Sequence, residues 1–295
     1  MDFIISFVEQ GLVYGIMALG VYITYKILDF PDLTVDGSFP LGAAVTAALI
    51  VQGVNPYLAL AASFAVGLAA GTCTGLIHVK CRVRDLLAGI IMMTALWTVN
   101  LRIAGTANVP LLSQETIFKN ELVSKIFPES LSAYSKLIII LVIVLICKLL
   151  LDLYLNTKSG FLLRAVGDND KLVTSLAKDQ GNVKILGLAL ANGLVSLAGS
   201  VFAQEQRVFE ISSGTGTVVI GLASVIIGTS LIKNLSFMKA TTAVLIGAVF
   251  YKACVAIALN RLNIQVQDTK LITAALLLIV LIISNGRRKK VKIDA

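Results

Sequence analysis

Few residues in this sequence have the types and the spacing that catalytic chemistry requires. The single histidine, His78, closes an apolar run, and the cysteines lack CxxC spacing: Cys73, Cys81, Cys147 and Cys254. Free cysteines of this kind behave as small buried hydrophobes. The sequence contains no HExxH and no GxSxG motif, the signatures of metalloproteases and of α/β-hydrolases. We therefore expect no catalytic residue and no metal site, and a membrane enzyme is the least favoured function.

One short stretch concentrates acidic groups where helices would be expected. The segment LDFPDLTVDGSFPLGA, residues 28–43, lies between two apolar runs and contains three carboxylates, Asp29, Asp32 and Asp36. Its two prolines can end or start helices, and Asp36 or Ser38 can cap the short helix that follows. The segment is either a capped hairpin at the membrane face or the first of two half-helices that border a pathway. Near that face, the three acids would avoid the full cost of burial.

The elements that position these residues are membrane helices. The 295 residues are 57% apolar and 14% charged, with a mean hydropathy of +0.89, which is far above the range of soluble domains. A spanning helix needs roughly 20 mostly apolar residues. Expected spans cover about residues 6–27, 38–53, 56–79, 86–105, 135–156, 184–203, 214–231, 240–258 and 270–284. We expect an all-α polytopic bundle of about 8–10 transmembrane helices, with short interrupted helices, as one domain over residues 1–295.

The basic residues favour one orientation of this bundle. With the N-terminus outside, the loops near Lys26, at residues 80–85, 157–184 and 233–239, and the tail RRKKVK share one face. Cytoplasmic loops collect Lys and Arg, so the N-terminus is predicted outside and the C-terminus in the cytoplasm. This bias accounts for the net charge of +8 without a nucleic-acid partner. The tail would lie near anionic lipid.

The long loop over residues 157–183 contains a candidate surface helix. Asp168 or Asn169 can cap it, and Gly181 can stop it. Four apolar residues follow the cap at near-helical spacing: Leu172, Val173, Leu176 and Ala177. A capped helix here would expose an apolar face. It either docks in a groove on a partner or folds back onto the bundle.

Four segments in combination resemble the permease subunits of the branched-chain amino-acid and sugar family of ABC importers. They are GLVYGIMALGVYITYKILDFPDLTVDGSFPLGA, RAVGDNDKLVTSLA, ANGLVSLAGS and VIGLASVIIG. The resemblance covers almost the whole chain and is strongest for the subset assigned to tryptophan or tyrosine. One departure lies in AQEQRVFEISSG, where Arg207 stands at a position often occupied by Gly in relatives.

The resemblance implies a permease that moves a small solute into the cell by alternating access, with amino acids, aromatic ones included, as leading substrates. The implied partners are two ATP-binding subunits, an extracytoplasmic solute-binding protein and a second permease copy in a homodimer, all at a bacterial plasma membrane. The chain has no GxxxxGK[ST] motif and so no Walker A loop for ATP phosphates. ATP and magnesium would therefore bind a partner, and the chain itself would be no enzyme.

The same resemblance assigns a role to the cytoplasmic loop. In the family this loop carries a coupling helix that enters a cleft of the ATP-binding subunit. Carried over to matching positions, the coupling residues would be Gly167, Asp168, Asn169, Leu172, Val173, Leu176 and Ala177.

Polar and small residues within or beside the spans are candidates for the translocation pathway, because buried polar groups tend to face a cavity or a partner helix. The candidates are Asp36, Ser38, Asn100, Asn192, Gly214 and Ser224. For Asn192, an interhelical hydrogen bond is the alternative. Residues 32–45 and 210–225 also share a pattern, an acid followed by Gly with Ser or Thr and then a short apolar helix. This pattern indicates either an inverted repeat, as in many transporters, or a chance match.

Two further patterns concern packing. Gly67, Gly71 and Gly75 recur every four residues, which would let another helix approach closely. The aromatic residues Tyr14, Tyr22, Tyr25 and Trp97 are expected in the core or at a membrane interface, although an aromatic substrate could stack on them.

The main rival function is a stand-alone carrier driven by H⁺ or Na⁺. Such carriers usually keep ionisable residues deep in the bilayer. Here the carboxylates are predicted to lie at the ends of spans, which favours the ATP-driven importer.

Overall fold

The computed structural model describes residues 2–126, 132–168, 180–231, 238–262 and 271–282. Its helices and strands follow one another as α1 (Asp2–Val21), the π-helix η1 (Tyr22–Ile27), α2 (Val35–Val51), α3 (Pro56–Val79), α4 (Asp85–Ala104), β1 (Asn108–Pro110), α5 (Glu121–Ile126), α6 (Ser132–Leu155), α7 (Lys158–Asp168), α9 (Gln180–Gln206), β2 (Val208–Glu210), the 3-10 helix η3 (Ile211–Gly214), α10 (Thr217–Leu231) and α11 (Ala240–Leu262). An apolar helix over Leu271–Ile282 follows.

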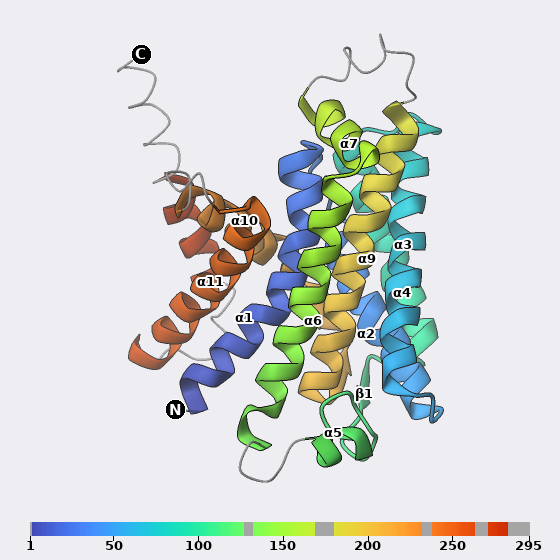
Figure 1. Ribbon diagram of the computed structural model, residues 1–295. Helices are drawn as coiled ribbons and strands as arrows, with labels where there is room; N and C mark the ends of the chain where they lie inside the picture. Colours follow the sequence, from blue (N-terminus) through green and yellow to red (C-terminus); the bar gives the residue numbers. More distant parts are fainter. Residues whose placement is uncertain (1, 127–131, 169–179, 232–237, 263–270, 283–295) are drawn as a thin grey trace.

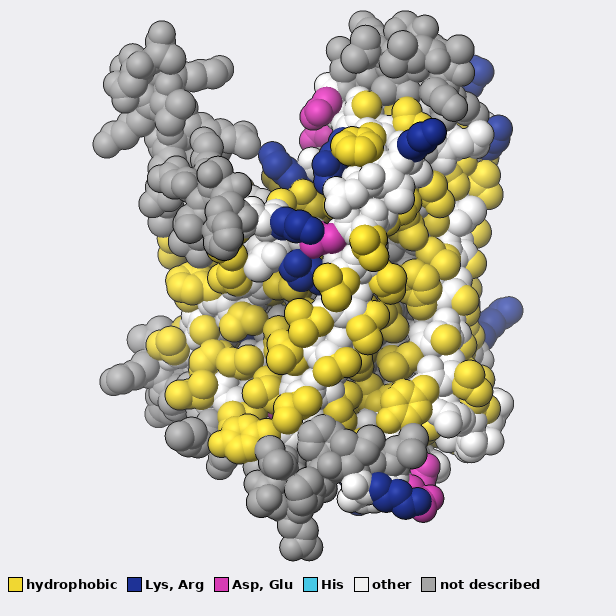
Figure 2. Space-filling model, viewed as in Figure 1, with side chains coloured by type: hydrophobic (Ala, Val, Ile, Leu, Met, Phe, Trp, Pro, Cys, Tyr) yellow, Lys and Arg dark blue, Asp and Glu magenta, His cyan; other side chains and the backbone are white. Residues whose placement is uncertain are grey.

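The polytopic helical fold is confirmed. Within the described residues, seven helices are long and apolar enough to cross a membrane, and two shorter apolar helices, α2 and Leu271–Ile282, accompany them. Apolar side chains cover most of the visible face, while charged side chains gather mainly toward its two ends (Figure 2). The α7 end and the α5 end of the bundle are therefore the candidate membrane faces (Figure 1).

The centre of the bundle is formed by α1 and α9. They are the most buried of the candidate spans, whereas α4 and α6 expose most of their apolar surface. Helix α9 packs against α1, α2 and α3, and α11 packs against α1 and α10. Exposed leucines and isoleucines on α6 are what a helix that faces lipid requires.

The predicted glycine face on α3 is confirmed as a packing surface. A Cβ atom at Gly67 would collide with the carbonyl of Asn192, and one at Gly71 with the carbonyl of Leu188; Gly75 also abuts the α9 backbone. Small residues let two helix backbones approach to this distance. The glycine face thus joins α3 to α9.

The second helix differs from its prediction. It begins at Val35 rather than near residue 38, and it continues through Pro40. Its N-cap residue is Thr34, which makes no side-chain capping bond, so neither Asp36 nor Ser38 caps this helix as predicted. A proline six residues into a helix removes the bond to the carbonyl four residues earlier, and that carbonyl, of Asp36, faces another segment instead.

The loop over residues 157–183 contains a helix that was not predicted, while the predicted helix after Asp168 or Asn169 lies outside the described residues. Helix α7 occupies its first part and ends at Asp168, where a helix was expected to begin. Gly160, Leu163 and Val166 are buried, so α7 lies back against the bundle. This amphipathic helix is short and rich in polar residues, which is why apolar run length alone did not indicate it.

At the α5 end, a small sheet closes the bundle. Strands β1 and β2 pair antiparallel with Asn108 opposite Glu210. Arg207, which precedes β2, has φ +55°, in the left-handed region that favours glycine. Glycine would adopt this backbone conformation at lower cost than Arg207 does.

Candidate functional site

The candidate site is the point where two short helices begin. Asp36, in the first turn of α2, accepts hydrogen bonds from the N–H groups of Gly216 (3.0 Å) and Val218 (2.8 Å) and from the Thr217 hydroxyl (2.9 Å). The first N–H groups of a helix lack partners within it, and a carboxylate there is also favoured by the helix dipole. Asp36 therefore caps α10, although it is 180 residues away along the chain.

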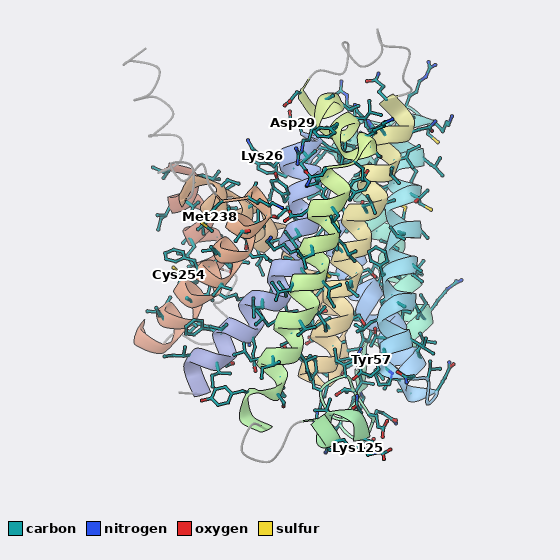
Figure 3. The ribbon with its side chains drawn as sticks, in the orientation of Figure 1. Lys26, Asp29, Tyr57, Lys125, Met238 and Cys254 are labelled. Atoms are coloured by element: carbon teal, nitrogen blue, oxygen red, sulfur yellow. The ribbon has the colours of Figure 1, made fainter. Side chains whose placement is uncertain are left out.

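The two helices lead away from this junction in opposite directions. Helix α2 leads to Tyr57 at the α5 end, and α10 leads toward Met238, which lies nearer the α7 end (Figures 1 and 3). Helix α2, with 17 residues, is only about 25 Å long, shorter than the roughly 30 Å hydrocarbon core, and α10, with 15 residues or about 22 Å, reaches spanning length only together with η3. They are thus a pair of discontinuous helices that meet at their N-termini.

Gly214 brings the two chain segments into contact. A Cβ atom at Gly214 would collide with the Asp36 carbonyl and would lie 2.5 Å from Cδ of Pro40. The carbonyl that Pro40 leaves without its helical partner faces this glycine. The absence of a side chain at Gly214 therefore permits the junction.

A second buried network joins α2 to α9 through Asn192. The Ser38 hydroxyl donates to Asn192 Oδ1 (2.7 Å), and Asn192 Nδ2 donates to Asp32 Oδ2 (2.8 Å) and to the Leu188 carbonyl (3.0 Å). Asn192 and Ser38 are fully buried. Asn192 thus makes the interhelical hydrogen bonds that were one of its two interpretations.

Asp32 does not lie at an exposed membrane face as predicted. Its side chain is buried in the linker between η1 and α2. Burial raises the pKa of its carboxyl, and the hydrogen bonds from Thr34 and Asn192 lower it, with burial the larger effect. Asp29, labelled in Figure 3, is exposed as predicted and has φ +51°. The acids of this stretch therefore occupy three different environments.

The remaining pathway candidates lie near the junction or beyond it. Asn100 is fully buried on α4 and donates from Nδ2 to the Gly37 carbonyl (3.0 Å), while its Oδ1 has no partner among the described residues. Ser224 lies further along α10 and donates to the Ile220 carbonyl of its own helix (2.7 Å). The structure thus brings together five of the six candidates and separates Ser224 from them.

Two of the predicted coupling residues lie within the described residues. Gly167 is in the last turn of α7, where a Cβ atom would collide with the Ile27 carbonyl of η1, and Asp168 is exposed. Asn169, Leu172, Val173, Leu176 and Ala177 lie outside the described residues. Helix α7 connects the predicted coupling segment directly to the break between α1 and α2.

An ion-pair cluster beside α7 was missed. Asp152 on α6 accepts from the Thr241 hydroxyl (2.6 Å) and from Lys148 (3.0 Å), and Lys239 lies at 3.3 Å. A cavity of about 190 Å³ lined by Tyr22 and Arg164 adjoins it. The spacing of Lys148 and Asp152, four residues apart, was a local signal; the approach of α11 was not visible in the sequence.

Comparison with known proteins identifies relatives over almost the whole chain. Residues 3–283 match the family described as the permease component of branched-chain amino acid transport systems. A tyrosine transport system permease protein of Clostridioides difficile is 42% identical over 97% of this chain and 92% of its own length.

More distant relatives name other solutes. A ribose import permease protein of Escherichia coli is 25% identical over 96% of this chain and 85% of its own. A probable branched-chain amino acid transport permease protein of Methanocaldococcus jannaschii is 27% identical over 72% of this chain and 69% of its own. No solved structure gives a significant match.

Proposed function

Because this chain belongs to the permease components of ABC-type transport systems for amino acids and sugars, we propose that it imports an amino acid by alternating access. The observation that carries the substrate class is the 42% identity to a tyrosine transport permease over nearly the whole chain. An aromatic amino acid is therefore the first solute to test. In this proposal the chain forms the membrane pathway, and ATP hydrolysis takes place on another subunit.

The junction at Asp36 supports a transport role. Discontinuous helices whose N-termini meet inside a bundle are a recurring feature of transporters, where they border the substrate pathway. Here the Asp36 carboxylate joins the two helix starts, and the buried Asn192 network fixes α2 to α9. A movement of α10 relative to α2 would have to break or carry along these hydrogen bonds. The junction is thus placed to act as a pivot during alternating access.

The proposed assembly contains two copies of the permease, two ATP-binding subunits and an extracytoplasmic solute-binding protein. The ATP-binding subunits would contact the α7 end, through Asp168 and the segment that follows it. Consistent with a cytoplasmic α7 end, Lys26, Arg164, Lys184 and Lys239 lie there with α7. This orientation keeps the N-terminus outside and the C-terminus in the cytoplasm.

An ion-coupled carrier remains the alternative, and the buried Asp32 is the observation that favours it. Ion-coupled carriers place ionisable residues inside the membrane region, and Asp32 is buried within the bundle. Its oxygens, however, accept bonds from Thr34 and Asn192 at 2.9 and 2.8 Å. Both acceptors are thereby engaged in holding α2 to α9.

Reconstitution with the neighbouring ATP-binding subunit separates the two functions. Proteoliposomes that contain both chains and the solute-binding protein should accumulate L-tyrosine only when ATP is present on the side of the membrane where the ATP-binding subunit lies. Uptake driven by an imposed proton or sodium gradient in the absence of ATP would establish the carrier instead. Substitution of both Leu172 and Leu176 by Asp should abolish ATP-driven uptake if that segment couples the subunits.

A further inference from the structure

A group of charged and aromatic side chains lies at the meeting point of α1, α9 and α11. Lys252, in the middle of α11, places its ammonium 3.8 Å from the centre of the Tyr14 ring on α1. Glu205, in the last turn of α9, follows Phe202 by three residues and so lies on the same face of that helix, where it accepts a hydrogen bond from Gln206 Nε2 (2.9 Å). We refer to Tyr14, Phe202, Glu205 and Lys252 as the Lys252 cluster.

The two charges of the cluster are not paired with each other at contact distance. Within the described residues, the ion pairs closer than 4.0 Å join Lys125 to Glu121 and join Lys148 and Lys239 to Asp152. Lys252 and Glu205 are both half-buried, on helices that are otherwise apolar. Ionisable side chains in spanning helices face the bundle interior or a polar cavity rather than lipid, because burial in hydrocarbon is costly. By this rule Lys252 and Glu205 face the interior of the bundle rather than lipid.

Aromatic rings form the other side of the cluster. Tyr14 stacks on Phe39 with ring centres 5.8 Å apart, and Phe202 meets the Tyr14 ring edge-on at 5.9 Å. Phe39 is fully buried, while Phe202 is half-buried and so presents part of its ring. Phe39 follows Ser38 of the Asn192 network directly, so the aromatic group rests on the same helix as the Asp36 junction.

We propose that the Lys252 cluster binds the zwitterionic amino acid within the membrane, a proposal that rests on the proposed function. Lys252 binds the α-carboxylate, Glu205 binds the α-ammonium, and Phe202 with the edge of Tyr14 contacts an apolar or aromatic side chain. A cation and an anion without a contact ion pair between them match an amino acid, whose carboxylate and ammonium groups are bonded to the same carbon atom. A sugar would leave both protein charges unpaired, which is unfavourable in a desolvated site.

Binding of tyrosine and its two half-charged analogues tests this assignment. The probes are L-tyrosine, tyramine, which lacks the carboxylate, and 3-(4-hydroxyphenyl)propionate, which lacks the ammonium. Displacement of tritiated L-tyrosine from the purified permease–ATPase complex gives the affinities. A charge-assisted hydrogen bond contributes roughly ten- to hundredfold in affinity, so the wild-type complex should prefer L-tyrosine over each analogue by that factor.

Each charge substitution should remove one preference and keep the other. Lys252→Met should bind L-tyrosine and tyramine equally while still disfavouring the propionate, and Glu205→Gln should show the reverse. Lys252→Arg should retain most of the wild-type preference because it keeps the cation. Arg102→Met is the matched control, since Arg102 is an exposed cation near the end of α4, and it should leave all affinities unchanged.

Three outcomes would overturn the site: equal weakening of all three probes by both variants, unchanged preferences in both variants, or no tyrosine displacement from the wild-type complex up to about 1 mM. Gel filtration and helical circular dichroism show whether each variant is folded. If proteoliposomes take up L-tyrosine with ATP while the analogue pattern is missing, the site fails and the proposed function stands. If the pattern is present without ATP-driven uptake, the ATP-driven function fails while the site stands.

Discussion

The Asp36 junction and the Lys252 cluster both place charge inside the helical bundle, yet their charges have different surroundings. The Asp36 carboxylate accepts three hydrogen bonds of 2.8–3.0 Å from the start of α10. The Lys252 ammonium instead lies on the Tyr14 ring and has no ion pair within 4.0 Å among the described residues. One charge is saturated by the protein, and the other retains capacity for a ligand.

This difference separates two roles for polar groups in a membrane protein. A carboxylate with all its donors in place fixes the relative position of two helices, because losing any donor is costly. A half-buried cation and anion that stand apart contribute little to the fold, and a ligand can pair with them. Stability and binding measurements on the same variants should therefore give opposite rankings for the two regions.

The largest effect on stability is expected at Gly214. Gly214→Val would force side-chain atoms into the Asp36 carbonyl and the Pro40 ring, neither of which can rotate away. Overpacking of this kind costs about 3 kcal/mol, and we expect loss of uptake together with a lower unfolding temperature in detergent. Thr215→Val, at the exposed neighbouring residue, is the control. A stable, active Gly214→Val protein would show that the two helix starts do not need to touch.

Removing the carboxylate of Asp36 comes next. Asp36→Ala leaves two N–H groups at the start of α10 without their acceptor and should reduce the free energy of unfolding by about 2 kcal/mol. Urea or thermal unfolding of the purified protein measures this loss, and ATP-driven uptake should fall with it. Asp29→Asn, at an exposed residue of the same stretch, should change neither, because asparagine tolerates the left-handed backbone of this position. Equal behaviour of both variants would return residues 28–43 to the role of an ordinary hairpin.

The Asn192 network should give a smaller loss. Asn192→Ala removes the interhelical bonds to Ser38 and Asp32, and membrane-protein bonds of this type contribute about 0.6 kcal/mol each, so a loss of about 1 kcal/mol is expected. A double-mutant cycle of Asn192→Ala with Ser38→Ala should show coupling between the two sites. Ser224→Ala is the control, because among the described residues the Ser224 hydroxyl bonds to its own helix alone. Strict additivity in the cycle would contradict a shared network.

The helical fold could be predicted because long runs of apolar residues indicate membrane-spanning helices. Helix α7 could not, since it is docked through Gly160, Leu163 and Val166, and a local pattern of mixed polarity does not reveal that contact. The glycine spacing on α3 did predict close packing, because residues four positions apart lie on the same face of a helix. Local periodicity therefore predicted the helices, whereas the contacts between them could be seen only in the structure.

The candidate site was only partly visible for the same reason. An acid followed by Gly and Ser indicates a helix start, and Asp36 does cap a helix, but that helix is α10 rather than α2. An aspartate can cap the helix that it begins or a helix that is distant in the sequence. The sequence alone could not show which of the two helices Asp36 caps. The burial of Asp32 could not be predicted, because its hydrogen-bond partner Asn192 is 160 residues away in the sequence. Long-range hydrogen bonds thus decided the burial of these acids.

The smallest effect on stability is expected at Lys252, and it tests the comparison most directly. Lys252→Met loses the contact with the Tyr14 ring, a cation–π interaction of about 0.5–2 kcal/mol, but it also removes the cost of holding a half-buried charge without a contact ion pair. These two contributions oppose each other. The free energy of unfolding, measured by thermal unfolding in detergent, should therefore change by less than about 1 kcal/mol in either direction. Tyrosine binding should nevertheless weaken.

Lys148→Met provides the matched comparison for that variant. Lys148 contacts the buried Asp152 carboxylate at 3.0 Å, so its removal leaves Asp152 with fewer donors and should destabilise the protein more than Lys252→Met, without changing the analogue preferences. If Lys252→Met instead lowered stability as much as Asp36→Ala does, Lys252 would belong with the groups that hold the helices together. The Asp36 junction and the Lys252 cluster would then no longer differ in role, because the charges of both would stabilise the fold.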